Sequence, residues 1–135
     1  MKMLSLRVNS LQQLDEAFAA MLAERPGALV VLADRVFLHG RDRIMAFAGQ
    51  QRLPGVYPYR ELVEAGGLMS YGPNYAEMHA SAARYVDKIF RGARPADLPI
   101  EQPIKFELVI NTKAAKALGI EVSPTLLALA DALIE

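Results

Sequence analysis

The spacing of apolar residues predicts that strands and helices alternate along the chain. Residues 3–8 alternate between apolar and polar side chains, which is typical of a strand. Ser10 and Gln13 have the spacing of a capping box, and the apolar residues after them recur at helical intervals until the Pro-Gly pair at 26–27. Residues 28–33 form a continuous apolar run rich in β-branched side chains, which indicates a strand buried on both faces of a parallel sheet.

The same alternation continues to the end of the chain. Residues 34–40 are expected to form a loop, and the Pro-rich residues 94–103 an extended connector. Short strands are predicted over residues 54–57, 68–71 and 106–110, and helices over residues 41–51, 59–65, 75–91, 112–119 (capped by Thr112) and 123–134. Together these elements predict an α/β fold with a mostly parallel, doubly wound sheet, in which ligands bind beyond the carboxyl ends of strands.

The composition is that of one folded domain. The 135 residues are 53% hydrophobic and 22% charged, so the chain can bury a core. Fifteen Lys and Arg balance fifteen Asp and Glu, and the basic residues are scattered, so no nucleic-acid partner is expected. The chain has no Cys, and His39 and His79 have no companion at metal-ligand spacing, so neither a metal nor another cofactor is expected.

The sequence shows no element that would direct or anchor the chain to a membrane. The first ten residues lack the continuous apolar segment of a secretory signal. The longest apolar run is too short to span a bilayer. A cytoplasmic location is therefore expected if Met1 is the true start.

Polar and aromatic side chains follow the first two predicted buried strands. Asp34 ends the apolar run, where its carboxylate either accepts a hydrogen bond from a ligand or caps the next turn. Tyr59, Arg60 and Glu61 follow the next strand. They suit a small organic acid or amino acid, because Arg binds carboxylates in a bidentate way and an aromatic ring can stack on a ligand. The alternative is that Tyr57 and Tyr59 are a pair of core residues beside a surface ion pair.

A third candidate group lies on the strand at 68–71. Ser70 and Tyr71 could offer hydroxyl groups to a ligand, and Gly72 permits close approach of the backbone, although a plain turn, strand and turn would look the same. No G-x-S-x-G motif and no credible pair of nucleophile and base is present, so no catalytic residue is expected. The third possibility, an enzyme of doubly wound fold, would require a set of catalytic residues that we do not find in the sequence.

One long motif in the middle of the chain is specific. It is the run RELVEAGGLMSYGPN at residues 60–74. Further characteristic segments, different in sequence from this run, lie at residues 29–34, 83–92, 95–99, 101–103, 106–111 and 114–119. These segments resemble the ABC-transporter substrate-binding family related to tryptophan- and tyrosine-binding importer proteins. Arg35 departs from the pattern, because the family has Pro after Asp34.

The resemblance implies a periplasmic-binding-protein type I architecture, in which two α/β lobes joined by three crossing strands trap a ligand between them. The chain would then be a single truncated solute-binding domain. Residues 1–66 and 106–135 would form the core of the second lobe. Residues 67–105 would supply a crossover strand, a helix and a connector of the first lobe, whose remaining parts the sequence does not contain.

The implied function is that of a solute-binding component of an ABC importer, or a truncated relative of one, located in the periplasm. It would bind a small solute such as an amino acid and contact the importer's membrane subunits. The ligand-binding residues implied by the resemblance are Asp34, Tyr59, Arg60, Glu61, Ser70, Tyr71 and Gly72. Asp34 or Glu61 would take an amine, and Arg60 would pair with a carboxylate or with Glu61. Binding by half a cleft should be weak or absent.

The apolar stripe of the helix at 75–91 would face a lobe that this sequence does not contain. Because monomers avoid large exposed apolar patches, a homodimer is expected, formed by exchange of residues 67–103 as in domain swapping. The alternative function is therefore a non-transport, homodimeric interaction or regulatory protein that binds no solute.

Overall fold

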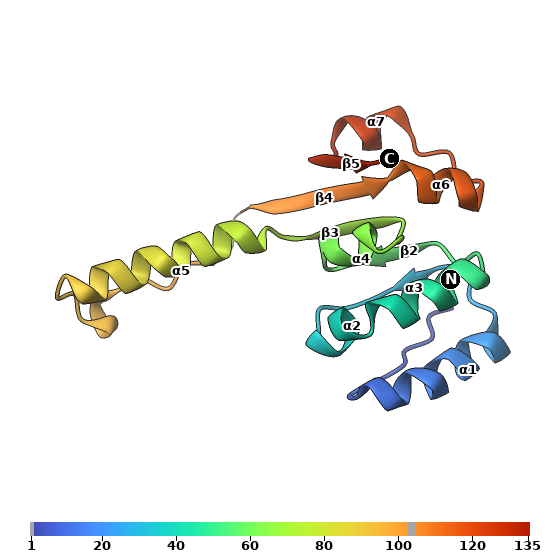
Figure 1. Ribbon diagram of the computed structural model, residues 1–135, viewed down its shortest axis with the longest axis horizontal. Coiled ribbons are helices and arrows are strands. Elements are labelled where there is room, and N and C mark those ends of the chain that lie inside the picture. Colours follow the sequence, from blue (N-terminus) through green and yellow to red (C-terminus); the bar gives the residue numbers. More distant parts are fainter. Residues whose placement is uncertain (1, 103–104) are drawn as a thin grey trace.

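Five strands form one sheet in the computed structural model, which describes residues 2–102 and 105–135 (Figure 1). Their order across the sheet follows the sequence: β1 (Leu29–Val30), β2 (Gly55–Tyr57), β3 (Met69–Pro73), β4 (Phe106–Asn111) and β5 (Ala132–Ile134). Neighbouring strands are parallel except for β3 and β4, which are antiparallel. The α/β class and the mostly parallel sheet flanked by helices are thereby confirmed.

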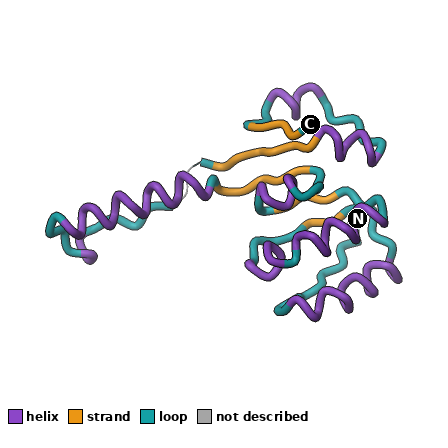
Figure 2. Tube along the Cα trace, viewed as in Figure 1, coloured by secondary structure: helices purple, strands orange, loops and turns teal. Residues whose placement is uncertain are grey.

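The helices divide into those that belong to a globular body and one that leaves it. The body contains α1 (Leu14–Glu24), α2 (Arg35–His39), α3 (Arg41–Gln50), α4 (Arg60–Glu64), α6 (Thr112–Leu118), α7 (Pro124–Ala128) and the short 3-10 helix η1 (Leu11–Gln13). Helix α5 (Tyr75–Phe90) projects from the body as an arm, and the connector with η2 (Pro95–Asp97) returns beside it (Figure 2). Within the described residues, no helix is long and apolar enough to cross a membrane.

Helix α4 contributes two of the fully buried side chains of the body. Leu62 and Val63 have no exposed surface, and α4 packs across β2, β3 and β4. The buried amide of Asn111 secures this packing, because its Nδ2 donates a hydrogen bond to the Val63 carbonyl oxygen at 3.2 Å. Its Oδ1 accepts from the Ala114 amide at 2.8 Å, so Asn111, rather than the predicted Thr112, caps α6.

An aromatic ring fills the space between two glycines beneath α4. Tyr57 is almost fully buried, and a side chain at Gly55 or Gly67 would overlap its ring. Farther from α4, Phe18 and Phe47 stack with their ring centroids 4.3 Å apart and so join α1 to α3. The core therefore depends on close contact between aromatic rings and small residues.

The amino-terminal segment differs from the sequence prediction. Residues 3–8 form no strand with any described element, and only Leu6 and Val8 turn toward the core clusters. The predicted capping box is also wrong: the Ser10 side chain makes no capping hydrogen bond, and Gln13 Oε1 accepts from the Asn9 amide at 2.8 Å instead. Periodicity alone could not reveal that no strand is available to pair with this segment.

Three further segments also differ from the prediction. The run at residues 28–33 forms only the two-residue strand β1, and Val30 is 68% exposed, so this strand is not buried on both faces. Residues 34–40 contain helix α2 instead of a loop, because the Asp34 carboxylate accepts the Val36 amide at 2.8 Å and starts a helical turn. The last helix ends at Ala128 and the chain then forms β5. This change is fixed by a double contact, in which Leu108 N donates to the Asp131 carboxylate at 2.8 Å and Asp131 N donates to the Leu108 carbonyl at 2.9 Å.

The buried phenol predicts the response of the protein to alkali. Burial raises the pKa of Tyr57 from 10.0 to about 12. The unfolded chain therefore ionises first as the pH rises, so stability present below pH 10 is lost between about pH 10 and 12, by about 2–3 kcal/mol. We expect Tyr57→Phe to raise the midpoint of alkaline unfolding followed by circular dichroism. Tyr71→Phe, at an exposed phenol, is the matched control, and equal midpoints for the two variants would contradict the assignment.

Candidate functional site

A pocket of about 220 Å³ lies where α4, the end of β3 and the start of α5 meet. Its position matches the expectation that ligands bind beyond the carboxyl ends of parallel strands, because Pro58 directly follows β2 and Pro73 ends β3. The pocket is lined by Pro58, Arg60, Glu61, Ser70, Gly72, Pro73, Asn74, Tyr75, Ala76 and Glu107.

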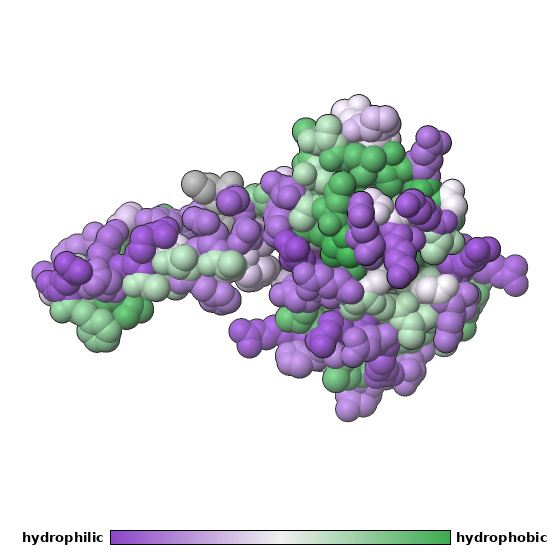
Figure 3. Space-filling view, turned by 45° about the horizontal axis from the view of Figure 1, so that its top comes forward, coloured by the Kyte–Doolittle hydropathy of each residue, from purple (hydrophilic) through white to green (hydrophobic). Residues whose placement is uncertain are grey.

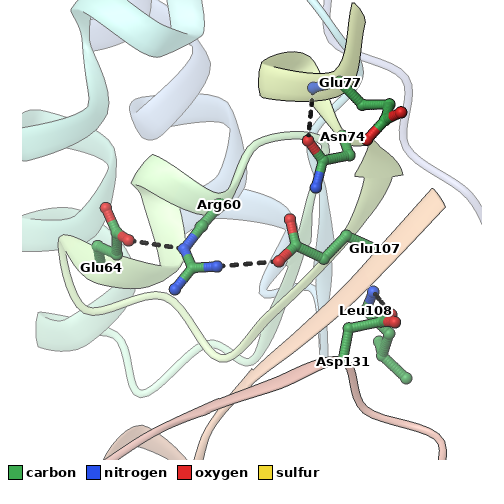
Figure 4. A network of polar contacts seen from close by, with 7 residues as sticks. All are labelled: Arg60, Glu64, Asn74, Glu77, Glu107, Leu108 and Asp131. Carbon is green, nitrogen blue, oxygen red and sulfur yellow. Dashed lines mark hydrogen bonds and ion pairs between the residues drawn. The ribbon is translucent and has the colours of Figure 1, made fainter. Parts of the chain in front are cut away.

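Arg60 ties two walls of the pocket together. Its Nε donates to Glu64 Oε1 at 2.8 Å and its Nη1 donates to Glu107 Oε1 at 2.9 Å, which connects α4 to β4 across β3 (Figure 4). The hydrogen bond to Glu64, followed by the charge of Glu107, raises the pKa of the Arg60 guanidinium, so it stays charged. Arg60 thus pairs with Glu64 and Glu107 rather than with Glu61. A solute carboxylate would have to displace one of these two partners.

The alternation of β3 decides which of its side chains face the pocket. Ser70 and Gly72 line it, whereas Tyr71 points to the opposite face, is 61% exposed and stacks on Phe106 at 5.5 Å. Ser70 is only 3% exposed, and it lies on the face of β3 that lines the pocket. A hydroxyl at this position can exchange a hydrogen bond with a polar group that enters the pocket.

The amino terminus of α5 forms the remaining wall. Asn74 Oδ1 accepts from the Glu77 amide at 3.0 Å and so caps the helix (Figure 4). Tyr75 and Ala76, in the first turn, line the pocket. The first turn of a helix carries free amide groups and a partial positive charge, which favour a negatively charged group nearby.

The pocket brings together some of the predicted ligand residues and leaves others outside. Arg60, Glu61, Ser70 and Gly72 line it. Tyr71 lies on the other face of the sheet, and Asp34 caps α2 and is not a lining residue. Tyr59 is not a lining residue, and its ring centroid lies 5.5 Å from that of Tyr75. Burial, and after it the neighbouring Tyr75, raises the pKa of the Tyr59 phenol.

Sequence reasoning missed Glu107 and Tyr75 as pocket residues. Glu107 reaches the pocket only because the β3–β4 pairing places it opposite Gly72, and this long-range register leaves no local signal. Tyr75 directly follows Asn74, the residue that caps α5. The cap residue was the local signal that the first turn of a helix begins at the pocket. Among the described residues, no group of three or more acidic or histidine side chains could hold a metal ion.

Gly72 gives a direct test of how tightly this pocket wall is built. A side chain at Gly72 would collide with the backbone carbonyl of Pro58. We expect Gly72→Ala to destabilise the fold by about 1–3 kcal/mol in denaturant unfolding, because β3 must then move away from the β2–α4 turn. Gly49→Ala is the matched control. This position in α3 has open space, so the change should stabilise by about 0.5–1 kcal/mol. Equal effects of the two substitutions would contradict the close packing.

Comparison with solved structures places this architecture among known folds. The chain matches a crystal structure of a conserved domain protein from Vibrio cholerae, with a TM-score of 0.89 and 26% identity over 98% of this chain and 45% of that one. It also matches an ABC domain from Streptococcus pneumoniae in complex with L-Trp, with a TM-score of 0.88 and 24% identity over 96% and 43% of the two chains. The ligand-free, open form of a substrate-binding protein with adhesive properties from Clostridium difficile gives a TM-score of 0.67 at 18% identity, over 99% of this chain and 44% of that one.

These matches confirm a mixed α/β fold of the periplasmic-binding-protein kind. The chain spans less than half the length of each of the three structures. None of the curated proteins compared with the chain matches it. The family model described as ABC transporter substrate binding protein matches residues 1–134. The chain therefore belongs to the ABC transporter substrate-binding protein family.

Proposed function

We propose that this chain supplies one wall of a solute-binding cleft that serves an ABC importer. The observation that carries the proposal is the meeting of Arg60, Glu61, Ser70 and Gly72 at one pocket, beside the first turn of α5. Family membership supports solute binding as the role. Binding would take place in the periplasm, without catalysis, and the importer's membrane subunits would receive the solute.

The chemistry of the pocket suits a zwitterionic amino acid. Among the lining residues, Glu61 and Glu107 carry carboxylates and Arg60 carries the one guanidinium. A carboxylate can therefore bind the ammonium group of an amino acid. The Ser70 hydroxyl and the amides of the first turn of α5 can donate hydrogen bonds to the carboxylate of the amino acid. L-tryptophan is the natural first probe, because the pneumococcal structure holds it.

We further propose the division of the chain that the resemblance implies. Residues 1–66 and 106–135 would form the second lobe, and residues 67–105 would reach toward the first lobe. The projecting arm supports this division, since α5 buries none of its residues against the body (Figure 1). A single wall holds a solute weakly, because closure between two walls normally supplies much of the buried contact.

The uncovered arm also favours the second candidate function, a homodimeric interaction protein that binds no solute. An amphipathic helix without a partner exposes apolar surface that a second protein surface would bury. A stable dimer that gives no response to any solute would favour this candidate over transport.

Ser70 offers the sharpest test of the proposed pocket. We expect L-tryptophan to bind the chain in calorimetric titration, and Ser70→Ala to weaken binding about fivefold, the cost of one lost hydrogen bond of about 1 kcal/mol. Ser10→Ala is the matched control, since the Ser10 side chain makes no capping bond and lies outside the pocket. Unchanged affinity in Ser70→Ala, with a normal circular dichroism spectrum, would exclude this pocket as the solute site.

A further inference from the structure

The charges around the pocket are unbalanced. Among the described lining residues, Arg60 is the one cationic side chain, and Glu61 and Glu107 are anionic. Glu64 adds a further carboxylate, because it bonds Arg60 from the next turn of α4 although it does not line the pocket. On the face shown in Figure 3, hydrophilic residues predominate where the arm joins the globular body. The pocket at the base of the arm therefore carries excess negative charge.

Arg60 already has two anionic partners. Its Nε lies 2.8 Å from Glu64 Oε1, and its Nη1 lies 2.9 Å from Glu107 Oε1. The carboxylate of a solute that approached Arg60 would also approach these two glutamates, and like charges at such distances repel each other. The two ion pairs thus weaken Arg60 as a receptor for an anion and leave the pocket better suited to a cation.

Glu107 is better placed to bind a cation than Glu61. The pairing of β3 with β4 sets Glu107 directly opposite Gly72, which has no side chain to cover it. The Glu107 side chain is only 20% exposed, whereas Glu61 lies exposed on α4. A carboxylate that is shielded from water interacts more strongly with a nearby cation than an exposed one does.

Arg60 also fixes the direction of the Glu107 carboxylate. It bonds one oxygen, Oε1, and the second oxygen points away from Arg60 (Figure 4). An ionised carboxylate accepts hydrogen bonds at both oxygens, so Glu107 can bind Arg60 and an ammonium group at the same time. These side chains belong to α4 and β4 of the globular body, so their pairing does not depend on the surface that forms the opposite wall of the cleft.

We propose that this pocket selects its solute by the ammonium group, and that Glu107 is the residue that binds this group. The inference rests on the proposed solute-binding function and narrows it. Arg60 and Glu64 are positioning residues in this site, because Arg60 holds Glu107 and Glu64 balances the charge of Arg60. The solutes that fit are small organic ammonium compounds, whether or not they carry a carboxylate.

Two indole compounds separate the charged ends of an amino acid. Tryptamine has the ring and the ammonium group of tryptophan without a carboxylate, and indole-3-propionate has the ring and a carboxylate without an ammonium group. In amide NMR titrations of the unaltered chain, we expect tryptamine to bind about tenfold more tightly than indole-3-propionate, because only tryptamine forms a charge-assisted hydrogen bond with Glu107.

The outcomes of these titrations separate this inference from the proposed function. Indole-3-propionate that binds as tightly as tryptamine, or more tightly, would overturn selection by the ammonium group and leave the solute site standing. If neither compound nor L-tryptophan binds, the proposed function fails, and this inference fails with it.

Substitution of Gln for Glu tests the named residues with little change of shape. Glu107→Gln keeps an oxygen that can accept from Arg60 but removes the negative charge, so the two compounds should then bind about equally. Glu64→Gln should reduce the preference for tryptamine severalfold, because the charge of Arg60 is then less balanced and attracts a carboxylate more strongly. Glu121→Gln, at an exposed position outside the pocket, is the matched control and should leave the preference unchanged.

The ratio of the two affinities is the informative quantity, since a purely structural defect would weaken both compounds alike. An unchanged ratio in Glu107→Gln, with a normal circular dichroism spectrum, would overturn the role of Glu107. An unchanged ratio in Glu64→Gln would overturn the positioning role of Glu64.

Discussion

The packing of α4 across β2, β3 and β4 is the constraint on which the rest of the structure depends. Leu62 and Val63 are fully buried in this contact, and Asn111 bonds the Val63 carbonyl while it caps α6. Because this buried face fixes the helix, its opposite face holds Arg60 between Glu64 and Glu107 at the end of β3. The same contact that stabilises the body therefore places the charged groups of the pocket.

Local sequence signals were sufficient for most of the elements and for part of the pocket. Apolar spacing and Gly or Pro residues near the ends predict strands β2, β3 and β4 and helices α4 and α5. These signals suffice because they lie within each element or directly beside it in the sequence. The signals failed where a distant partner decides the structure. Residues 3–8 alternate like a strand but have no neighbour to pair with, and the contact between Asp131 and Leu108 turns a predicted helix into β5.

The pocket shows the same division between local and long-range information. Arg60, Glu61, Ser70 and Gly72 belong to one specific run of sequence, and therefore could be proposed together. Glu107 joins them only through the antiparallel register of β3 and β4. Tyr71 was misleading because adjacent residues of a strand point to opposite faces, so its neighbours Ser70 and Gly72 reach the pocket while its own ring stacks on Phe106.

We propose that a solute contacts this chain at the junction of α4, β3, β4 and the first turn of α5. Two-dimensional amide NMR during a titration with L-tryptophan tests it most directly, because each residue reports separately. We expect chemical-shift changes that concentrate at Arg60, Glu61, Ser70, Tyr75 and Glu107 and saturate together. Shifts that concentrate instead around Asp34 and α2, or a spectrum that L-tryptophan leaves unchanged, would contradict it.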